Sequence, residues 1–187
     1  MRPWPPVANL LGVDTGTGTV RPAQPSDAAG IGLVHVRSWQ AAYRGQFPQD
    51  YLDGLDPARR AAGWRRYFEP EPPHRQALLV SEIGADIVGF ASVGPCRDRD
   101  TAGAGELYAI YLLTQWWGQG LGRQLMAAAL GALAGLGFEE ATLWVLDAND
   151  RARLFYEAAG WAADGATKTD DSFGFPMAEV RYHRLLP

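Results

Sequence analysis

The segment Glu106–Met126, ELYAIYLLTQWWGQGLGRQLM, carries the clearest pattern with a chemical use. An apolar, strand-like run ends in a glycine-rich turn, and a helix-like run begins directly after it. Backbone N–H groups left free at such a junction, together with the positive end of the helix dipole, bind anions. Glycines at 118, 120 and 122 allow unusual dihedral angles and let the backbone approach a phosphate without a Cβ in the way. The segment therefore predicts an enzyme or binding protein for a phosphate-bearing cofactor.

Two common classes of phosphate-binding protein do not fit this turn. A nucleotide hydrolase of the P-loop type needs Gly-Lys-Ser/Thr after the glycines, and that sequence is absent. A dinucleotide-binding fold places its turn after the first strand, whereas this turn lies past the midpoint of the chain. A tight turn without any ligand remains open from this segment alone.

A second segment, LWVLDANDRARLFYEAAGW, adds two polar side chains at helical spacing. An apolar strand leads into a helix with Asn149 near its start and Tyr156 seven residues later. Seven residues at ~100° each return to nearly the same helix face, about 10 Å further along the axis. One face thus carries an amide and a phenol, suited to an extended ligand lying alongside. Taken singly, Asn149 is typical of a helix cap and Tyr156 of a core aromatic.

Periodicity and turn residues predict the elements that must position these side chains. In chain order we expect a strand near Thr19–Pro22, a helix from Ser26 to about Tyr43, short helices at Pro48–Leu55 and Pro57–Phe68, a hairpin of Gln76–Ile83 and Asp86–Gly94, a strand at Glu106–Leu113, a helix from Leu121, a buried strand at Ala141–Leu146, a helix at about Asn149–Ala159, and strands near Trp161–Asp164 and Phe173–Leu185. The pattern predicts an α/β or α+β sandwich. Residues 1–18, with several Pro and a Gly/Thr run, are expected to form a mobile extension outside the core.

Composition limits the classes of function. A length of 187 residues suits one domain, and a net charge of −4 gives no support to a nucleic-acid partner. A single cysteine, Cys96, excludes a thiolate metal cluster, and three histidines without ligand spacing predict no metal site. Because no apolar run approaches ~20 residues and the N-terminus lacks a signal-peptide pattern, we expect a soluble cytoplasmic protein with no membrane partner.

Together, the segments Glu106–Met126 and Asn149–Trp161 resemble the GNAT superfamily of N-acetyltransferases. The phrase VHVRSWQAAYRG, from Val34 to Gly45, is similar to the first-helix segment of many bacterial members. The resemblance covers the chain from about Val20 to the end, and it implies a GNAT-like domain over residues 19–187. The implied fold is a mixed, mostly antiparallel central sheet of six to seven strands, flanked by helices and splayed between the fourth and fifth strands.

The resemblance implies acetyl-CoA as the cosubstrate, with its pyrophosphate on backbone amides of a loop Q/R-x-x-G-x-G/A. Gln115–Gly120 matches that pattern literally, but the strand end and the Leu-Gly-Arg opening of the helix favour the register Trp117–Gly122. In that register Trp117 replaces the family's Gln or Arg, which puts a polar role for this position in doubt. The implied cofactor-binding residues are Tyr111, Leu112, Leu113, Trp117, Gly118, Gln119, Gly120, Leu121, Gly122, Arg123, Asn149 and Tyr156.

The chemistry of amine acetylation assigns two catalytic candidates. A lysine-like amine, with a pKa of about 10.4, must lose a proton before it attacks a thioester. Glu106, eleven residues before Trp117, lies where a strand carboxylate is the base in some family members, although a solvent-exposed strand-end role is equally open. Tyr156 matches the tyrosine that protonates the departing sulfur. A backbone N–H near Leu112 or Leu113 would meet the developing oxyanion. Direct attack in a ternary complex is expected, without Cys96 as an acyl carrier.

The acceptor site should come from the first two helices and their loop. Trp39, Tyr43 and Phe47, with His35 as a further candidate, predict an aromatic-lined cleft for a small-molecule amine or a peptide N-terminus. The leading interpretation is an acetyl-CoA-dependent N-acetyltransferase. Two others are a catalytically idle acyl-CoA-binding sensor and a plain interaction domain. The C-terminal strands and the 7 tryptophans leave room for a homodimer surface.

Overall fold

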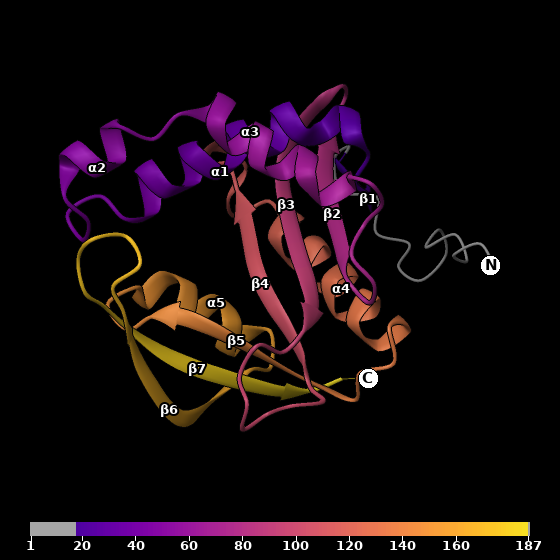
Figure 1. Ribbon diagram of the computed structural model, residues 1–187, viewed down its shortest axis with the longest axis vertical. Coiled ribbons are helices and arrows are strands. Elements are labelled where there is room, and N and C mark those ends of the chain that lie inside the picture. Colours follow the sequence, from indigo (N-terminus) through magenta and orange to yellow (C-terminus); the bar gives the residue numbers. More distant parts are fainter. Residues whose placement is uncertain (1–17, 187) are drawn as a thin grey trace.

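Residues 18–186 are described by the computed structural model, which contains one seven-stranded sheet in the order β1-β2-β3-β4-β5-β7-β6 (Figure 1). Neighbouring strands are antiparallel except for the parallel pair β4–β5. This mixed, mostly antiparallel sheet confirms the predicted fold class. The strands are β1 (Gly18–Pro22), β2 (Ala77–Ile83), β3 (Asp86–Pro95), β4 (Gly105–Leu112), β5 (Glu140–Leu146), β6 (Ala162–Asp170) and β7 (Met177–Leu185).

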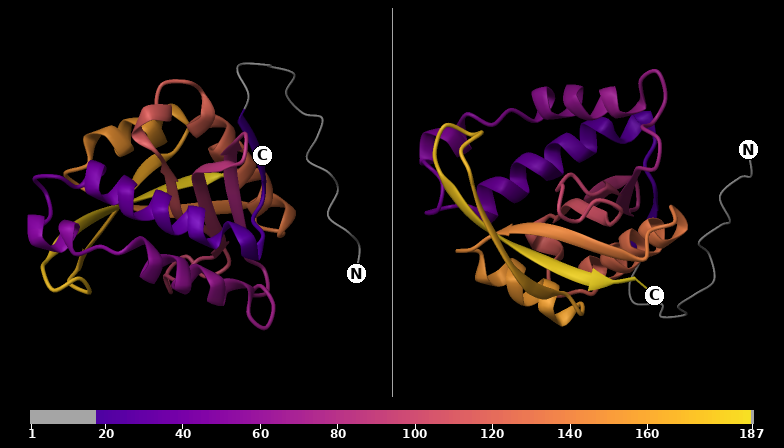
Figure 2. Two further views of the ribbon diagram at one scale, coloured as in Figure 1. Left: turned by 90° about the horizontal axis from the view of Figure 1, so that it is seen from above. Right: turned by 60° about the horizontal axis from the view of Figure 1, so that its bottom comes forward.

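Helices cover both faces of this sheet. They are α1 (Ala28–Ala42), α2 (Gln49–Asp53), α3 (Pro57–Arg65), α4 (Leu121–Gly135) and α5 (Asp150–Ala158), with short 3-10 turns at Pro25–Asp27, Arg66–Phe68 and Thr114–Trp116. Figure 2 shows α1 and α3 on one face and α4 and α5 on the other. No helix among the described residues is long and apolar enough to cross a membrane.

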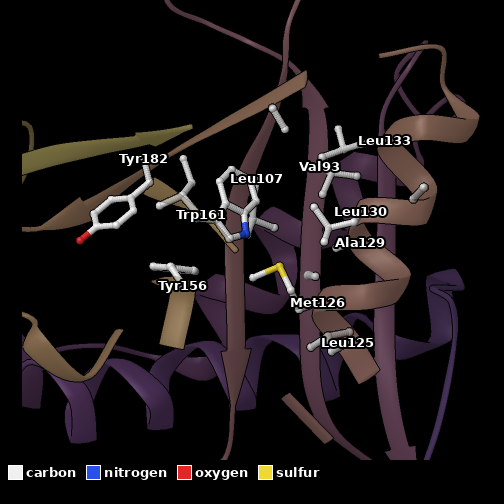
Figure 3. Packing of buried hydrophobic residues seen from close by; sticks show 14 of the residues in the cluster. Val93, Leu107, Leu125, Met126, Ala129, Leu130, Leu133, Tyr156, Trp161 and Tyr182 are labelled. Carbon is white, nitrogen blue, oxygen red and sulfur yellow. The ribbon is translucent and has the colours of Figure 1, made fainter. Parts of the chain in front are cut away.

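Each face has its own apolar core. On the α4 face, Leu125 and Met126 with Ala129, Leu130 and Leu133 point toward Val93 of β3 and Leu107 of β4 (Figure 3). Their helical spacing is the reason that this segment forms an amphipathic helix rather than a strand. On the α1 face, Ile31 and Val34 pack on Phe90 of β3. The two cores hold the sheet between them and fix the position of β4.

The strands β4 and β5 pair only at their first residues. The parallel register joins Gly105 to Ala141 and Glu106 to Thr142, and it extends no further. Beyond that point β4 stays with β3 and β5 stays with β7, so the two halves of the sheet diverge. A register shift against β3 leaves Tyr108 without a Cα partner, which marks a β-bulge in β4. The predicted splay between the fourth and fifth strands is therefore present, and it opens the space in which the site lies.

The structure differs from the expected elements mainly near the C-terminus. The strand expected near Trp161–Asp164 extends to Asp170, and the strand expected at Phe173–Leu185 begins at Met177. The intervening residues form a turn with Gly174 at φ 86°, and the Asp170 carboxylate accepts a hydrogen bond from the Ser172 N–H. The expected extension 1–18 lies outside the described residues except for Gly18, which belongs to β1.

Candidate active site

One cavity of about 890 Å³ lies at the gap between β4 and β5 and collects residues from distant parts of the chain. It is lined by both predicted catalytic residues, Glu106 and Tyr156. Most of the other predicted site residues also line it, namely Trp39, Tyr43, Phe47, Tyr111, Leu112, Trp117, Gly118, Gly120, Gly122, Arg123 and Asn149. The structure thus brings together residues that lie as far apart in the sequence as Trp39 and Tyr156.

Three of the predicted cofactor-binding residues do not line the cavity. The side chain of Gln119 donates a hydrogen bond to the Gln115 carbonyl at 2.9 Å, within the turn itself. Leu121 is buried, and its side chain lies against Gly18 of β1. The Leu113 N–H donates to the Val88 carbonyl at 2.9 Å. Any contact that Gln119 or Leu121 makes to a ligand must therefore come from the backbone.

The glycine turn, residues 117–122, has the geometry of an anion site. Gly118 and Gly120 take φ values of 75° and 86°, in the left-handed region that glycine adopts without strain. A Cβ at Gly118 would meet no atom within 4 Å. Within the described part of the chain, no hydrogen bond between backbone groups uses the N–H groups of residues 118–122. The glycines 118, 120 and 122 line the cavity at the start of α4, so a pyrophosphate fits this turn.

Trp117, which stands where the family has Gln or Arg, holds the turn in place. Its indole N–H donates to the Leu112 carbonyl at 2.8 Å, which ties the turn to the end of β4. The guanidinium of Arg151, a residue that we did not predict, lies 3.9 Å from the centre of the Trp117 ring. Arg151 and Arg123 both line the cavity. Two cations therefore lie next to the anion site, and the proximity of Arg151 to Asn149 in the sequence was the available signal.

Asn149 caps α5, as its position at the helix start indicated. Its side-chain oxygen accepts a hydrogen bond from the Ala152 N–H at 3.1 Å. The oxygen thus has a structural partner, while an asparagine amide also carries two N–H donors. Asn149 lines the cavity, so these donors are the part of the side chain suited to a ligand.

Tyr156 is a buried tyrosine that nonetheless lines the cavity; its side chain packs near Trp161 and Tyr182 (Figure 3). Burial, with the neighbouring Tyr111 as a smaller cause, raises the pKa of Tyr156 above that of a free phenol. Burial similarly raises the pKa of Tyr43, with Tyr111 beside it as the next cause. These phenols are protonated at neutral pH, and Tyr156 is able to donate a proton within the cavity.

The backbone at the end of β4 offers one N–H group to the gap. Because N–H groups alternate in direction along a strand, the Leu113 bond to Val88 turns the Leu112 N–H away from β3. It faces the side of β5, which has no register partner at this height. Of the two predicted oxyanion donors, Leu112 is thus the one that the strand geometry directs into the cavity.

Glu106 is buried, and its carboxylate is fully engaged. The Arg97 side chain donates to both oxygens, with Nε at 3.1 Å from each, and the Arg97 N–H donates to Oε2 at 2.9 Å. The Glu106 side chain is 2% exposed, whereas that of Arg97 is 66% exposed. Glu106 is therefore a buried carboxylate held by a partner at the surface, and the solvent-exposed strand-end role that the sequence left open does not describe it.

Aromatic side chains form one end of the cavity. Trp39, Tyr43 and Phe47 pack on one another, and Phe173 from the β6–β7 turn lies 5.2 Å from Trp39 between ring centres. Phe173 and Met177 line the cavity but were not predicted, because nothing local in the sequence indicates that this turn folds back onto α1. His35 is packed beside Tyr111 and does not line the cavity.

Charged side chains, most of them from the sheet strands, also line the cavity. Glu179 of β7, Lys168 of β6 and Trp144 of β5 line the cavity. Asp98 and Asp170 line it too, and the Trp144 indole N–H donates to Asp98 at 2.8 Å. These residues were not predicted from the sequence. The alternation Met177, Glu179, Arg181 in β7 was the only available signal that one strand face carries charge.

Comparisons with known proteins agree on one family. The model of the acetyltransferase (GNAT) family matches residues 36–161. The uncharacterized N-acetyltransferase YuaI of Bacillus subtilis is 35% identical over 75% of this chain and 78% of its own. The PaiA N-acetyltransferase of Thermoplasma acidophilum, solved in complex with coenzyme A, is 17% identical, with a TM-score of 0.66 over 90% of this chain and 99% of that one. An N-acetyltransferase of Staphylococcus aureus superimposes with a TM-score of 0.70 at 15% identity, over 92% of this chain and 100% of that one.

Proposed function

The chain belongs to the GNAT acetyltransferase family, and from that premise we propose that it transfers the acetyl group of acetyl-CoA to a primary amine of a small molecule or a peptide N-terminus. The amine attacks directly while both substrates are bound. The observation that carries the proposal is that Tyr156 and the turn glycines 118, 120 and 122, whose N–H groups take part in no hydrogen bond between backbone groups, line the same cavity.

The cofactor end of the cavity holds the pyrophosphate. Backbone N–H groups of residues 118–122 donate to it, and the Arg123 and Arg151 guanidinium groups lie close enough to the turn to add attraction. The amide N–H groups of Asn149 contact the pantetheine arm. Bound acetyl-CoA supplies an activated acyl group as a thioester.

Tyr156 acts as the general acid. Its phenol is protonated at neutral pH, and it gives its proton to the departing sulfur. The Leu112 N–H donates to the acetyl oxygen and stabilises the negative charge that develops there. Both groups come from elements that border the gap between β4 and β5.

Glu106 acts as the base that receives the proton of the acceptor amine. Both of its oxygens are held by Arg97, so this role requires the exposed Arg97 side chain to move aside or a water molecule to relay the proton. The same ion pair is the observation that favours a second candidate, a catalytically idle acyl-CoA-binding module. The Glu106→Gln variant tests the base: a fall of about 10²–10⁴-fold in kcat with an unchanged Kd of acetyl-CoA supports it, and an unchanged kcat contradicts it.

A screen for release of the CoA thiol tests the proposed function. The purified chain is incubated with acetyl-CoA and, one at a time, with alkylamines, polyamines, aminoglycosides and peptides with a free N-terminus. We expect thiol release with at least one class and a thermal shift with acetyl-CoA alone. A thermal shift without thiol release for any amine supports the idle module. The absence of a thermal shift would contradict acetyl-CoA binding altogether.

A further inference from the structure

Lys168 is the only lysine of the chain, which has 17 Lys and Arg residues in all. It lies on β6 and lines the same cavity as Tyr156 and the glycine turn. In a protein that acetylates primary amines, the one side chain with a primary amine is thus placed in the cavity that holds the catalytic groups. The Lys168 side chain is 39% exposed, so its amine is open to solvent and to a ligand in the cavity.

The Lys168 amine occupies a defined position over the sheet. Nζ lies 3.3 Å from Oε2 of Glu179 on β7 and 4.1 Å from the centre of the Trp144 ring on β5. The side chain therefore reaches from the edge strand β6 across β7 toward β5, the strand that borders the gap. A carboxylate and an aromatic face are both attractive to an ammonium group, so this position accepts a primary amine of any origin.

Glu179 is suited to receive a proton at this position. Its side chain is 17% exposed, and Lys168 is the cation paired with it. Glu179 also lies near the phenols of the cavity, since its charge is one of the smaller causes, after burial, that raise the pKa of Tyr43 and of Tyr111. Tyr111 in turn raises the pKa of Tyr156. Glu179, Tyr111 and Tyr156 all line the cavity that Lys168 lines.

We propose that Lys168 is a modification site, acetylated on Nζ by the protein's own active centre from acetyl-CoA. This inference rests on the proposed function. One ammonium proton passes to Glu179, the nitrogen lone pair forms a bond to the acetyl carbonyl carbon, and the carbon–sulfur bond breaks. Coenzyme A leaves as the thiol with the proton of Tyr156, and the second proton of the nitrogen returns to the Tyr156 phenolate. The product is an amide on Lys168 and one equivalent of free CoA.

Acetylation at Lys168 changes the charge of the cavity. The amide carries no charge, so Glu179 loses its cationic partner and becomes an unpaired carboxylate that faces the acceptor space. The Trp144 ring face loses its cation at the same time. A cationic acceptor amine then meets a Glu179 carboxylate that no longer pairs with Lys168. The binding of the acceptor amine therefore becomes stronger.

The experiment needs acetyl-CoA alone. The full chain, in a preparation whose Lys168 peptide is unmodified, is incubated with isotopically labelled acetyl-CoA and analysed by intact mass and peptide mapping. Only Lys168 and the chain N-terminus carry a primary amine. We expect one label on the Lys168 peptide, at a rate that saturates with acetyl-CoA and does not depend on protein concentration. The Lys168→Arg variant keeps the charge without an acylatable amine, and its peptide should carry none.

Two further variants distinguish enzymatic from chemical acylation. Tyr156→Phe and Glu179→Gln should each slow labelling of Lys168 at least about tenfold, whereas chemical acylation would be unaffected. Equal labelling in these variants or in urea-unfolded protein overturns the proposal. So does an unlabelled Lys168 in protein that acetyl-CoA stabilises against heating. If acetyl-CoA gives no thermal shift, the proposed function has failed, and this outcome is distinct from the others.

Discussion

The two ends of the cavity are built from different parts of the polypeptide. At the cofactor end, the glycine turn presents backbone N–H groups, and two of its glycines have positive φ values. At the acceptor end, aromatic and charged side chains converge from α1, from the β6–β7 turn and from the faces of β5, β6 and β7. Main-chain donors are independent of side-chain identity, which suits the constant pyrophosphate group that we propose for the first end. Side-chain surfaces change with each substitution, which suits the acceptor selection that we propose for the second end.

The proposed catalytic residues, Tyr156 and Glu106, line the same cavity, and substitution of Tyr156 should have the largest effect. Tyr156→Phe should lower kcat by about 10²–10⁴-fold with little change in the Kd of acetyl-CoA, because the ring stays and only the proton donor is lost. Single-turnover kinetics and calorimetric titration measure the two quantities.

Tyr182→Phe is the matched control for this variant. Tyr182 is also buried, but its hydroxyl donates to Glu157 at 2.7 Å and the residue does not line the cavity. This variant should lose stability and keep kcat. Equal losses of kcat and of acetyl-CoA affinity in Tyr156→Phe would mean that the phenol serves binding.

The main-chain character of the cofactor end predicts an effect of Gly120→Ala. Alanine at a φ of 86° costs about 1–2 kcal/mol, and the turn relieves this strain by moving its N–H groups. The Kd of acetyl-CoA should rise about tenfold, while the KM of the amine stays the same. Gly131→Ala is the control, because Gly131 lies inside α4 with open space around its Cα, and it should stabilise the helix without changing the Kd. A normal Kd in Gly120→Ala would argue against backbone recognition.

Because side chains form the acceptor end, a substitution there should change the KM of the amine and not the Kd of acetyl-CoA. Phe173→Ala should change the KM of the amine about fivefold and leave the Kd of acetyl-CoA as it was. Phe175 in the same turn packs on Phe47 and Tyr51 without lining the cavity. The Phe175→Ala variant should therefore change only the melting temperature. If both variants alter acetyl-CoA binding, the two ends are not independent.

His35, packed beside Trp39 and Tyr111, makes the stability of the fold depend on pH. Burial, and then the charge of Arg60, lower the pKa of His35 to about 3, and its Nδ1 accepts a hydrogen bond from the Trp64 indole. The folded chain keeps His35 neutral, while the unfolded chain binds a proton below about pH 6.5. His35 therefore contributes stability above that pH, and the contribution falls as the pH drops toward 3.

The expected change in unfolding free energy is the smallest of the effects predicted for these variants. Between about pH 7 and 6 the wild-type chain should lose roughly 0.7 kcal/mol of unfolding free energy more than His35→Gln, which does not titrate. Urea unfolding at the two pH values measures the difference. The exposed His74→Gln should behave as the wild type, and a wild-type slope in His35→Gln would mean that His35 is protonated in the fold.

Most of the fold followed from periodicity and turn residues. The β-rich runs of β2 and β3 on either side of Gly84 and the apolar stripe of α4 are local patterns, and a sequence shows them without knowledge of tertiary contacts. The end of β6 was missed because Thr167, Lys168 and Thr169 lie on an exposed edge strand and carry no apolar alternation. Their strand conformation comes from pairing with β7, which is a tertiary contact.

The sequence predicted the residues of the glycine turn and Asn149, but it did not predict the charged side chains at the other end of the cavity. Glycines in the turn and Asn149 at a helix start have backbone roles that spacing alone indicates. The Arg97–Glu106 pair depends on how the 96–104 loop folds back over β4, and the Lys168–Glu179 pair depends on register between β6 and β7. Such contacts join residues that no local pattern relates, so the sequence could not predict these charged pairs.

The divergence of β4 from β5 gives the central strand two rates of amide hydrogen exchange. N–H groups of β4 that point to β3 lie in a ladder that the bulge at Tyr108 interrupts, and the N–H of Leu113 at its end bonds to Val88. The alternate groups at Ile110 and Leu112 point to the gap, where β5 offers no register partner. Deuterium should therefore enter one side of this strand early and the other side late, although both belong to the middle of the sheet. Bound acetyl-CoA would slow the early set, so exchange at Leu112 reads out occupancy of the cavity residue by residue.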